Sequence, residues 1–290
     1  MIDSRTVEEL VKQIVLQMYP DIKDITNEPE ETLDGKELDI VDITLEEYRK
    51  TPQVESAEDI EGLQRMITKT PARIGVGRAG GRLKTSTYLT LRADHAMARD
   101  SVFKGVDESL ISELGLLTVQ TKCKDINEHL TRPDLGRMFD DEVLAKIKSN
   151  CKESPQVQIY ISDGLSSSAV EANAKDILPS IFQGLQNYNI SVGTPFFVKF
   201  GRVPAMDVIT ETLKSEITCV LIGERPGLAT ANSMSAYITY RGTVGMPEAR
   251  RTVVSNIHSG GIGAVEAGAY IADIMKKMLE LKVSGVDLTL

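Results

Sequence analysis

The most constraining feature of this sequence is an alternation of apolar runs and amphipathic stretches that begins at Val157 and continues to Leu281. The short apolar runs predict buried strands, and the longer stretches between them repeat apolar residues at helical spacing. The expected strands are 157–162, 190–200, 217–223, 235–240 and 252–256, and the expected helices are 168–188, 205–215 and 264–281. This order predicts an α/β fold with a Rossmann-like, mostly parallel sheet that carries helices on both faces.

The chain before this alternation has a different texture. Residues 44–151 are expected to be mainly helical, with segments at 45–50, 56–66, 88–103, 108–114 and 140–150. Earlier still, Thr6 and Glu9 form a capping-box pattern before an apolar stripe that Pro20 ends, and this predicts an amphipathic helix. Residues 21–42 hold nine acids and two bases, which indicates a solvated linker. We therefore expect an extension over 1–43, a mainly helical region over 44–151 and an α/β domain over 152–290. The first helix either docks on the body of the protein or binds a partner.

Charge and composition exclude several classes of protein. A net charge of −9, from 42 acids against 33 Lys and Arg, argues against nucleic-acid binding, which needs a basic surface. No run approaches the roughly 18 apolar residues of a membrane span, and the acids among the first nine residues argue against an export signal. Three widely spaced cysteines suggest neither a disulfide framework nor a zinc site. A soluble protein of a reducing cytoplasm is expected.

Charged and polar residues follow several of the expected strands. The run 217–223 ends abruptly in Glu224 and Arg225, followed by a Pro-Gly turn. The turns expected beside it are Asp163-Gly164, Gly201-Arg202-Val203 and the neighbourhood of 253–258. The carboxyl ends of parallel strands share one edge of a sheet, where ligands bind, so these turns predict a site for a large polar ligand. Taken singly, Glu224 and Arg225 are equally compatible with a local ion pair.

Other candidate motifs are weaker. Gly75, Gly77 and Gly80 match Gly-x-Gly-x-x-Gly, but no buried strand precedes them and they lie well before the α/β half. A basic loop against an acidic partner surface is the favoured interpretation, and an NAD-type nucleotide-binding oxidoreductase is the alternative. The three histidines have neither zinc spacing nor a nucleophile partner, so no catalytic or metal-binding residue is assigned.

Seven longer phrases occur between Arg73 and the C-terminus. They are Gly77-Arg-Ala-Gly80, Leu91-Arg-Ala-Asp-His95, Leu130-Thr-Arg-Pro-Asp-Leu-Gly-Arg137, Ile161-Ser-Asp-Gly-Leu-Ser166, Val192-Gly-Thr-Pro-Phe-Phe-Val198, Val220-Leu-Ile-Gly-Glu-Arg-Pro-Gly-Leu228 and Ser255-Asn-Ile-His258. Together, and in this order, they resemble the small subunit of ethanolamine ammonia-lyase.

The resemblance implies a subunit of an adenosylcobalamin-dependent lyase that converts ethanolamine to acetaldehyde and ammonia. In that family a large TIM-barrel subunit performs the chemistry, six large and six small subunits form a dodecamer, and the non-catalytic small subunit covers the lower part of the corrinoid. The family motifs place the cofactor contacts at Val203, Glu224 and Val253. Relatives can have Cys at the last position, so valine there leaves a backbone contact.

The residue chemistry agrees with that implication. Corrin side arms carry amide donors around an apolar ring, so Glu224 can accept a hydrogen bond while Val203 and Val253 pack nearby. The sequence lacks Asp-x-His-x-x-Gly, so the cofactor is expected to keep its own lower base. The resemblance also implies a place in the bacterial cytoplasm, inside a microcompartment. A third hypothesis is a scaffold that recruits the enzyme there through the helix over 6–19.

Overall fold

The computed structural model describes residues 42–289, and Ile43–Leu290 form one compact unit. The helix expected over 6–19 and the acidic linker, apart from Asp42, lie outside the described residues. Within the described range, no helix combines the length and the apolar character needed to cross a membrane.

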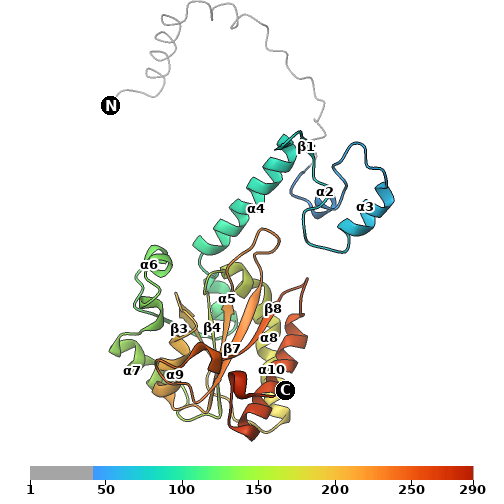
Figure 1. Cartoon of the computed structure of the whole chain (residues 1–290). Helices are drawn as coiled ribbons and strands as arrows, with labels where there is room; N and C mark the ends of the chain where they lie inside the picture. Colours follow the sequence, from blue (N-terminus) through green and yellow to red (C-terminus); the bar gives the residue numbers. More distant parts are fainter. Residues whose placement is uncertain (1–41, 290) are drawn as a thin grey trace, which may run out of the picture. The chain divides into compact units, whose positions relative to one another are not determined.

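The first part of the described chain is largely helical. It contains α2 (Glu46–Arg49), α3 (Ile60–Ile67), the short hairpin β1 (Arg78–Ala79) and β2 (Arg82–Leu83), α4 (Thr85–Phe103) and α5 (Glu108–Glu113) (Figure 1). Helix α3 begins where the Asp59 side chain accepts a hydrogen bond from the Gly62 amide at 2.7 Å, a standard N-terminal cap. Helix α4, with 19 residues, is the longest element before the sheet.

The rest of the chain alternates strands and helices. Its elements are β3 (Leu117–Gln120), α6 (Ile126–Thr131), the 3₁₀ turn η2 (Leu135–Arg137), α7 (Asp141–Asn150), β4 (Val157–Ser162), α8 (Ser167–Asn187), β5 (Phe196–Lys199), α9 (Ala205–Leu213), β6 (Ile217–Gly223), β7 (Met234–Tyr240), η3 (Glu248–Arg250), β8 (Thr252–Ile257), α10 (Ala264–Leu281) and η4 (Gly285–Asp287).

Six of these strands form one sheet in the order β3-β5-β4-β6-β7-β8. Strands β3, β5, β4 and β6 are parallel to one another, whereas β7 is antiparallel to both of its neighbours. Five strands therefore run in one direction and β7 in the other. The predicted α/β class and mostly parallel sheet are confirmed.

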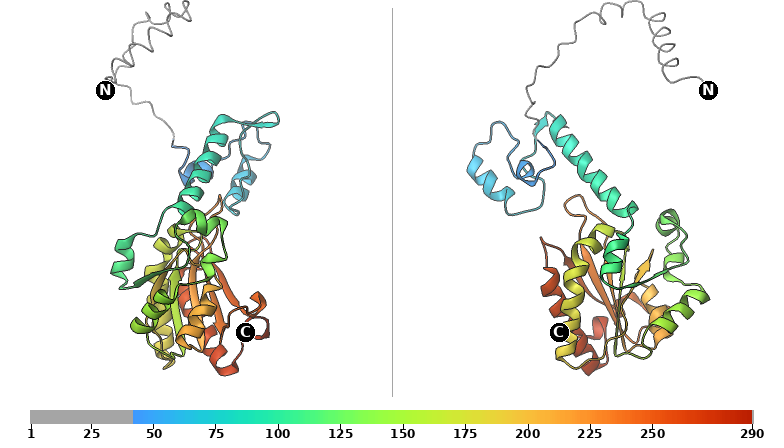
Figure 2. Two further views of the ribbon diagram at one scale, coloured as in Figure 1. Left: turned by 90° about the vertical axis from the view of Figure 1, so that its left-hand side faces the viewer. Right: turned by 180° about the vertical axis from the view of Figure 1, so that it is seen from behind.

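Each face of the sheet packs against its own helices. Helices α8 and α10 lie side by side over one face, and α7 and α9 cover the other (Figures 1 and 2). A Cβ on Gly184 would lie 2.6 Å from the Cβ of Ala272, so the close approach of α8 and α10 requires glycine there. Every residue of β4 and β6 is buried, as expected for central strands covered on both faces.

Three expectations need correction. Strand β3 and helix α6 were not predicted, because four to six residues give too short a pattern to recognise. Strand β5 begins at Phe196, although the apolar run predicts a strand from Ile190. Pro195 has no amide to donate, and Gln158 bonds to the Thr194 carbonyl at 2.8 Å, so the segment before Phe196 joins the sheet only through an isolated bridge between Val192 and Val157.

Candidate functional site

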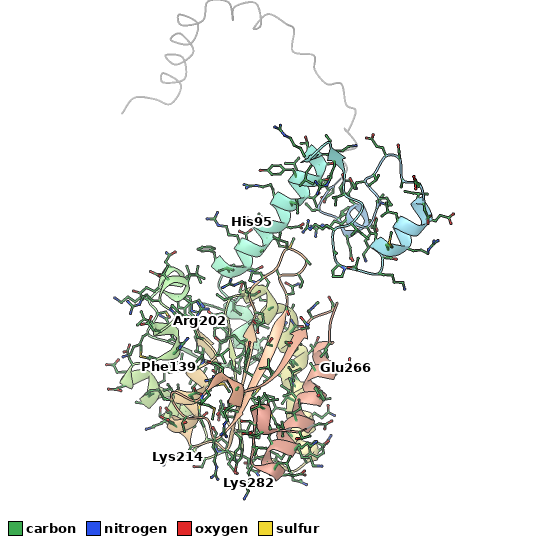
Figure 3. All side chains as sticks on the ribbon, in the orientation of Figure 1. His95, Phe139, Arg202, Lys214, Glu266 and Lys282 are labelled. Atoms are coloured by element: carbon green, nitrogen blue, oxygen red, sulfur yellow. The ribbon has the colours of Figure 1, made fainter. Side chains whose placement is uncertain are left out.

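The carboxyl ends of β4, β5 and β6 lie together at one edge of the sheet. Ser162 near the end of β4 pairs with Val198 of β5 and with Ile222 of β6, so the loops that follow begin side by side. Strand β8 runs in the same direction and ends at the same level. Arg202 lies at this edge, whereas Lys214, which precedes β6, lies at the opposite one (Figure 3). The predicted gathering of these turns is confirmed.

Asp163 fixes the turns after β4 and β5. Its carboxylate accepts backbone hydrogen bonds from Phe200 and Gly164, both at 2.9 Å. Burial raises the pKa of Asp163 to about 6, although these amide donors favour the charged form. Gly164 has a φ of +55°, and a Cβ there would lie 2.4 Å from the Gly223 carbonyl oxygen, so the β4 turn rests directly on the end of β6.

His129 ties α6 to the same edge. Its Nε2 lies 2.7 Å from the Gly164 carbonyl oxygen, and its own carbonyl accepts from Arg202 Nη2 at 2.5 Å. Burial, and then the nearby charge of Arg202, lower the pKa of His129 to about 4, so the ring is neutral and its Nε2 donates to the Gly164 carbonyl. These contacts make His129 a structural part of the edge.

Glu224 follows β6 and is half-buried. The Tyr237 hydroxyl donates to Glu224 Oε1 at 2.8 Å. Burial, and then this carboxylate, raise the pKa of Tyr237 to about 12, so the hydroxyl keeps its proton. Among residues 42–289, Glu224 makes no ion pair with Arg225, so the local pair that the sequence left open is not formed. The Glu224 carboxylate thus has an uncharged hydrogen-bond donor beside it.

Val203 and Val253 lie on the same side of the sheet as Tyr237. Val203, just beyond β5, is partly buried against the apolar cluster that also contacts Tyr237. Val253 pairs directly with Tyr237 in the antiparallel ladder, so both side chains point to one face. Val253 is 45% exposed. Val253 falls within the strand expected over 252–256, and it lies inside β8, four residues before the strand ends, so it is not part of the turn that follows.

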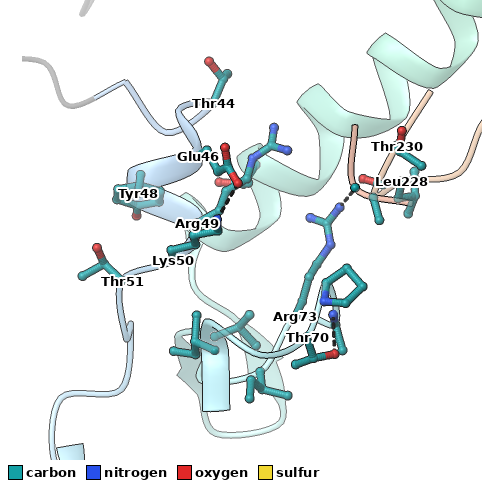
Figure 4. Close-up of a pocket in the computed structure, with 18 of the residues that line it drawn as sticks. Thr44, Glu46, Tyr48, Arg49, Lys50, Thr51, Thr70, Arg73, Leu228 and Thr230 are labelled. Carbon is teal, nitrogen blue, oxygen red and sulfur yellow. Dashed lines mark hydrogen bonds and ion pairs between the residues drawn. The ribbon is translucent and has the colours of Figure 1, made fainter. Parts of the chain in front are cut away.

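A cavity of about 740 Å³ opens beside this edge (Figure 4). Its wall includes Arg49 and Arg73 from the helical region, residues 228–230 after β6, and Asn256 with residues 258–261 at the end of β8. Loops from the candidate edge and the helical region therefore share one hollow of the size that holds small ligands.

The glycine-rich motif has a structural role. The glycine-rich segment forms the β1–β2 hairpin, and Gly80 takes a φ of +60° between its strands. A dinucleotide fingerprint would instead join a buried strand to a helix, so this segment does not form one.

In the described part of the chain, no group of three or more His, Cys, Asp or Glu side chains is placed to hold a metal ion.

Comparison with known proteins identifies the family. A family model described as ethanolamine ammonia-lyase light chain (EutC) matches residues 60–289. An ethanolamine ammonia-lyase small subunit from Clostridium tetani is 58% identical over 287 residues, which cover 99% of this chain and 97% of the relative. The chain belongs to the ethanolamine ammonia-lyase small-subunit family.

Other members of the family align over the same length. The small subunit from Clostridium perfringens is 52% identical over 97% of both chains, and that from Fusobacterium nucleatum is 48% identical over the whole of both. The resemblance seen in the sequence is therefore confirmed. The family assignment and the β1–β2 hairpin together leave the nicotinamide-enzyme alternative without support.

The three residues predicted for the site of this small-subunit family member were Val203, Glu224 and Val253, and the prediction did not include Tyr237, which contacts Glu224. In sequence, Tyr237 looks like one more residue of an alternating strand. Its link to Glu224 depends on the register in which β6 and β7 pair, and a ten-residue connection separates these two strands. An aromatic hydroxyl on a half-buried strand position was the available signal, since such hydroxyls usually find a partner.

Proposed function

We propose that this chain is the non-catalytic small subunit of an adenosylcobalamin-dependent ethanolamine ammonia-lyase. In this role it holds the lower side of the corrinoid against a large subunit that carries the substrate pocket. The names of the relatives supply the activity and imply the large-subunit partner. By analogy with the family, six such pairs form the working dodecamer.

The observation that carries this proposal is the Glu224–Tyr237 pair beside exposed Val253. Glu224 is a half-buried charged acceptor, and Val253 and Val203 offer apolar surface on the same side of the sheet. A corrinoid needs this combination, because amide arms surround its apolar ring. The residues present therefore fit the periphery of the cofactor.

The role of these residues is to bind and orient. When bound, adenosylcobalamin supplies the radical chemistry of the lyase, and the protein supplies position and electrostatics. Glu224 would accept from a corrin amide, while Val203 and the Val253 backbone would pack at the ring edge. We also propose that the cofactor keeps its own lower base, since the sequence lacks the Asp-x-His-x-x-Gly pattern of corrinoid proteins that replace it.

Location follows from the family in the same way. We propose a cytoplasmic enzyme packaged in a bacterial microcompartment, with the extension before Thr44 as the packaging signal. Deleting that extension should abolish packaging and leave the lyase activity intact. Loss of activity on deletion would instead give the extension a role in the enzyme itself.

Reconstitution with a large subunit tests the proposed function. The chain alone should release no ammonia, and addition of the large subunit with adenosylcobalamin should restore release. In the complex, Glu224→Ala should weaken cofactor binding by about 1–3 kcal/mol, because a corrin amide loses its acceptor. Glu266→Ala, at an exposed position on α10, is the control and should bind as the unchanged protein does. Equal affinities for both variants would refute the role of Glu224.

A further inference from the structure

Arg73 links the helical region to the loop that carries Glu224. Its Nη2 lies 2.5 Å from Asp94 Oδ2 on α4. The same Nη2 donates to the Leu228 carbonyl oxygen at 2.9 Å (Figure 4). Leu228 is four residues beyond Glu224, in the connection between β6 and β7. The Asp94 side chain is only 2% exposed, so Arg73 is anchored on a buried carboxylate while it holds the loop.

The same carboxylate has a second cation. Arg49 of α2 contacts Asp94 Oδ1, and its side chain is 29% exposed, as is that of Arg73. Both arginines therefore make the same kind of ion pair with the same acid at the same exposure. They differ in that Arg73 also reaches the loop.

The loop has unequal support along its length. Near β7, Ser166 Oγ donates to the Ala231 carbonyl at 2.6 Å and Asn173 Nδ2 to the Asn232 carbonyl at 3.0 Å. Across 225–229, by contrast, most residues are exposed. Among the described residues, the hydrogen bond that ties this stretch to a different element is the one from Arg73. Within the loop, Gly227 N donates to the Thr230 carbonyl at 2.9 Å and Glu224 N to the Ser233 carbonyl at 3.0 Å, so Arg73 supplies the side-chain hydrogen bond that holds 225–229 to the helical region.

We propose that Arg73 is a positioning residue for cofactor binding, which fixes the loop so that the Glu224 carboxylate is held in its binding orientation. The inference rests on the proposed function of Glu224. An exposed loop loses conformational freedom when it binds a ligand, and a loop already fixed in its bound form loses less. Arginine suits the task because its planar donors serve a carboxylate and a carbonyl together, whereas a lysine ammonium is a compact point charge.

The test compares Arg73→Lys and Arg73→Gln with Arg49→Lys and Arg49→Gln, each in the full chain complexed with the large subunit. Adenosylcobalamin affinity is measured by absorbance titration. Hydrogen–deuterium exchange over 225–230 is measured in the same complexes without cofactor. The Arg73 variants should raise Kd about fivefold to tenfold, the range expected for about one lost hydrogen bond, and should speed exchange over 225–230. The Arg49 variants should change neither quantity.

A second comparison asks whether Arg73 acts through Glu224. When Glu224 is already alanine, replacing Arg73 should raise Kd no further, because no carboxylate remains to be oriented. If the Arg73 and Arg49 variants have equal affinities and equal exchange, the positioning role is wrong. If Arg73→Gln prevents assembly with the large subunit, Arg73→Lys decides the outcome by the same two measurements.

Failure of the proposed function has a different signature. In that case Glu224→Ala binds the cofactor normally, while exchange over 225–230 still reports whether Arg73 fixes the loop. Weak binding by Glu224→Ala with normal exchange in both Arg73 variants would instead retain the function of Glu224 and refute the role of Arg73.

Discussion

Removing the Tyr237 hydroxyl should weaken cofactor binding without disturbing the fold. Tyr237→Phe deletes one donor, 2.8 Å from Glu224 Oε1, and keeps the ring that packs against the apolar cluster. The carboxylate would then lose the contact that fixes its orientation. The carboxylate would also be better hydrated in the cofactor-free protein. Because cofactor binding would have to remove that water, this too would weaken the affinity.

The size of the effect follows from the exposure of the pair. A hydrogen bond to a charged group contributes about 1.5–3 kcal/mol when it is well buried. Glu224 and Tyr237 are both half-buried, so water replaces part of the lost contact, and we expect about 1 kcal/mol, or about a fivefold rise in Kd. Absorbance titration of the reconstituted complex with adenosylcobalamin measures it.

Tyr240→Phe is a matched control on the same strand. Tyr240 is also half-buried, but its hydroxyl has no hydrogen-bond partner among the described residues, so its removal should leave Kd unchanged. The reasoning would be refuted if both phenylalanine variants bound the cofactor equally well while Glu224→Gln bound it poorly. That result would mean that Glu224 acts without help from Tyr237.

Two further predictions concern the turn after β4. The raised pKa of Asp163, about 6 against 3.8, means that its contribution to stability is fully present below pH 3.8 and is lost as pH rises through 6. Thermal unfolding should therefore show that, from pH 4 to 8, the free energy of unfolding of Asp163→Asn rises relative to that of the unchanged protein, by up to about 3 kcal/mol at neutral pH. A difference between the two proteins that stays constant with pH would contradict this. Gly164→Ala should cost about 3 kcal/mol or more, because its Cβ would meet the Gly223 carbonyl at 2.4 Å. Gly245→Ala, at φ +86° with open space around it, should cost about 1 kcal/mol, and similar melting temperatures for the two variants would count against the steric explanation.

Elements with clear flanking signals were predictable from the sequence. The bounds of β4, β6 and α10 agree with expectation because each apolar pattern ends at a strong local change. Strand β6 stops at the charged Glu-Arg pair before proline, and α10 stops where Lys282 adopts a left-handed conformation. Local chemistry was sufficient in these cases.

The missed elements depend on contacts between distant parts of the chain. The four residues of β3 form a strand because they pair with β5, whose first residue, Phe196, lies opposite Leu117. Nothing within Leu-Thr-Val-Gln reveals that partner. The link between Arg73 and Leu228, which are 155 residues apart, was hidden for the same reason. Sequence patterns report which residues prefer burial, whereas register and long-range pairing decide which residues meet.

The partner of Glu224 bears directly on its ability to bind a ligand. An ion pair with adjacent Arg225 would have offset the charge of the carboxylate and occupied its oxygens. In the fold, Glu224 contacts the neutral Tyr237 hydroxyl instead, through one of its two oxygens. The high pKa of Tyr237 keeps that hydroxyl a donor across the physiological range, so the contact orients the carboxylate without placing a positive charge beside it. An amide-bearing ligand is bound by a fixed, charged acceptor at the edge of an apolar surface. If Glu224 were instead paired with an arginine in a surface salt bridge, it would bind such a ligand less well.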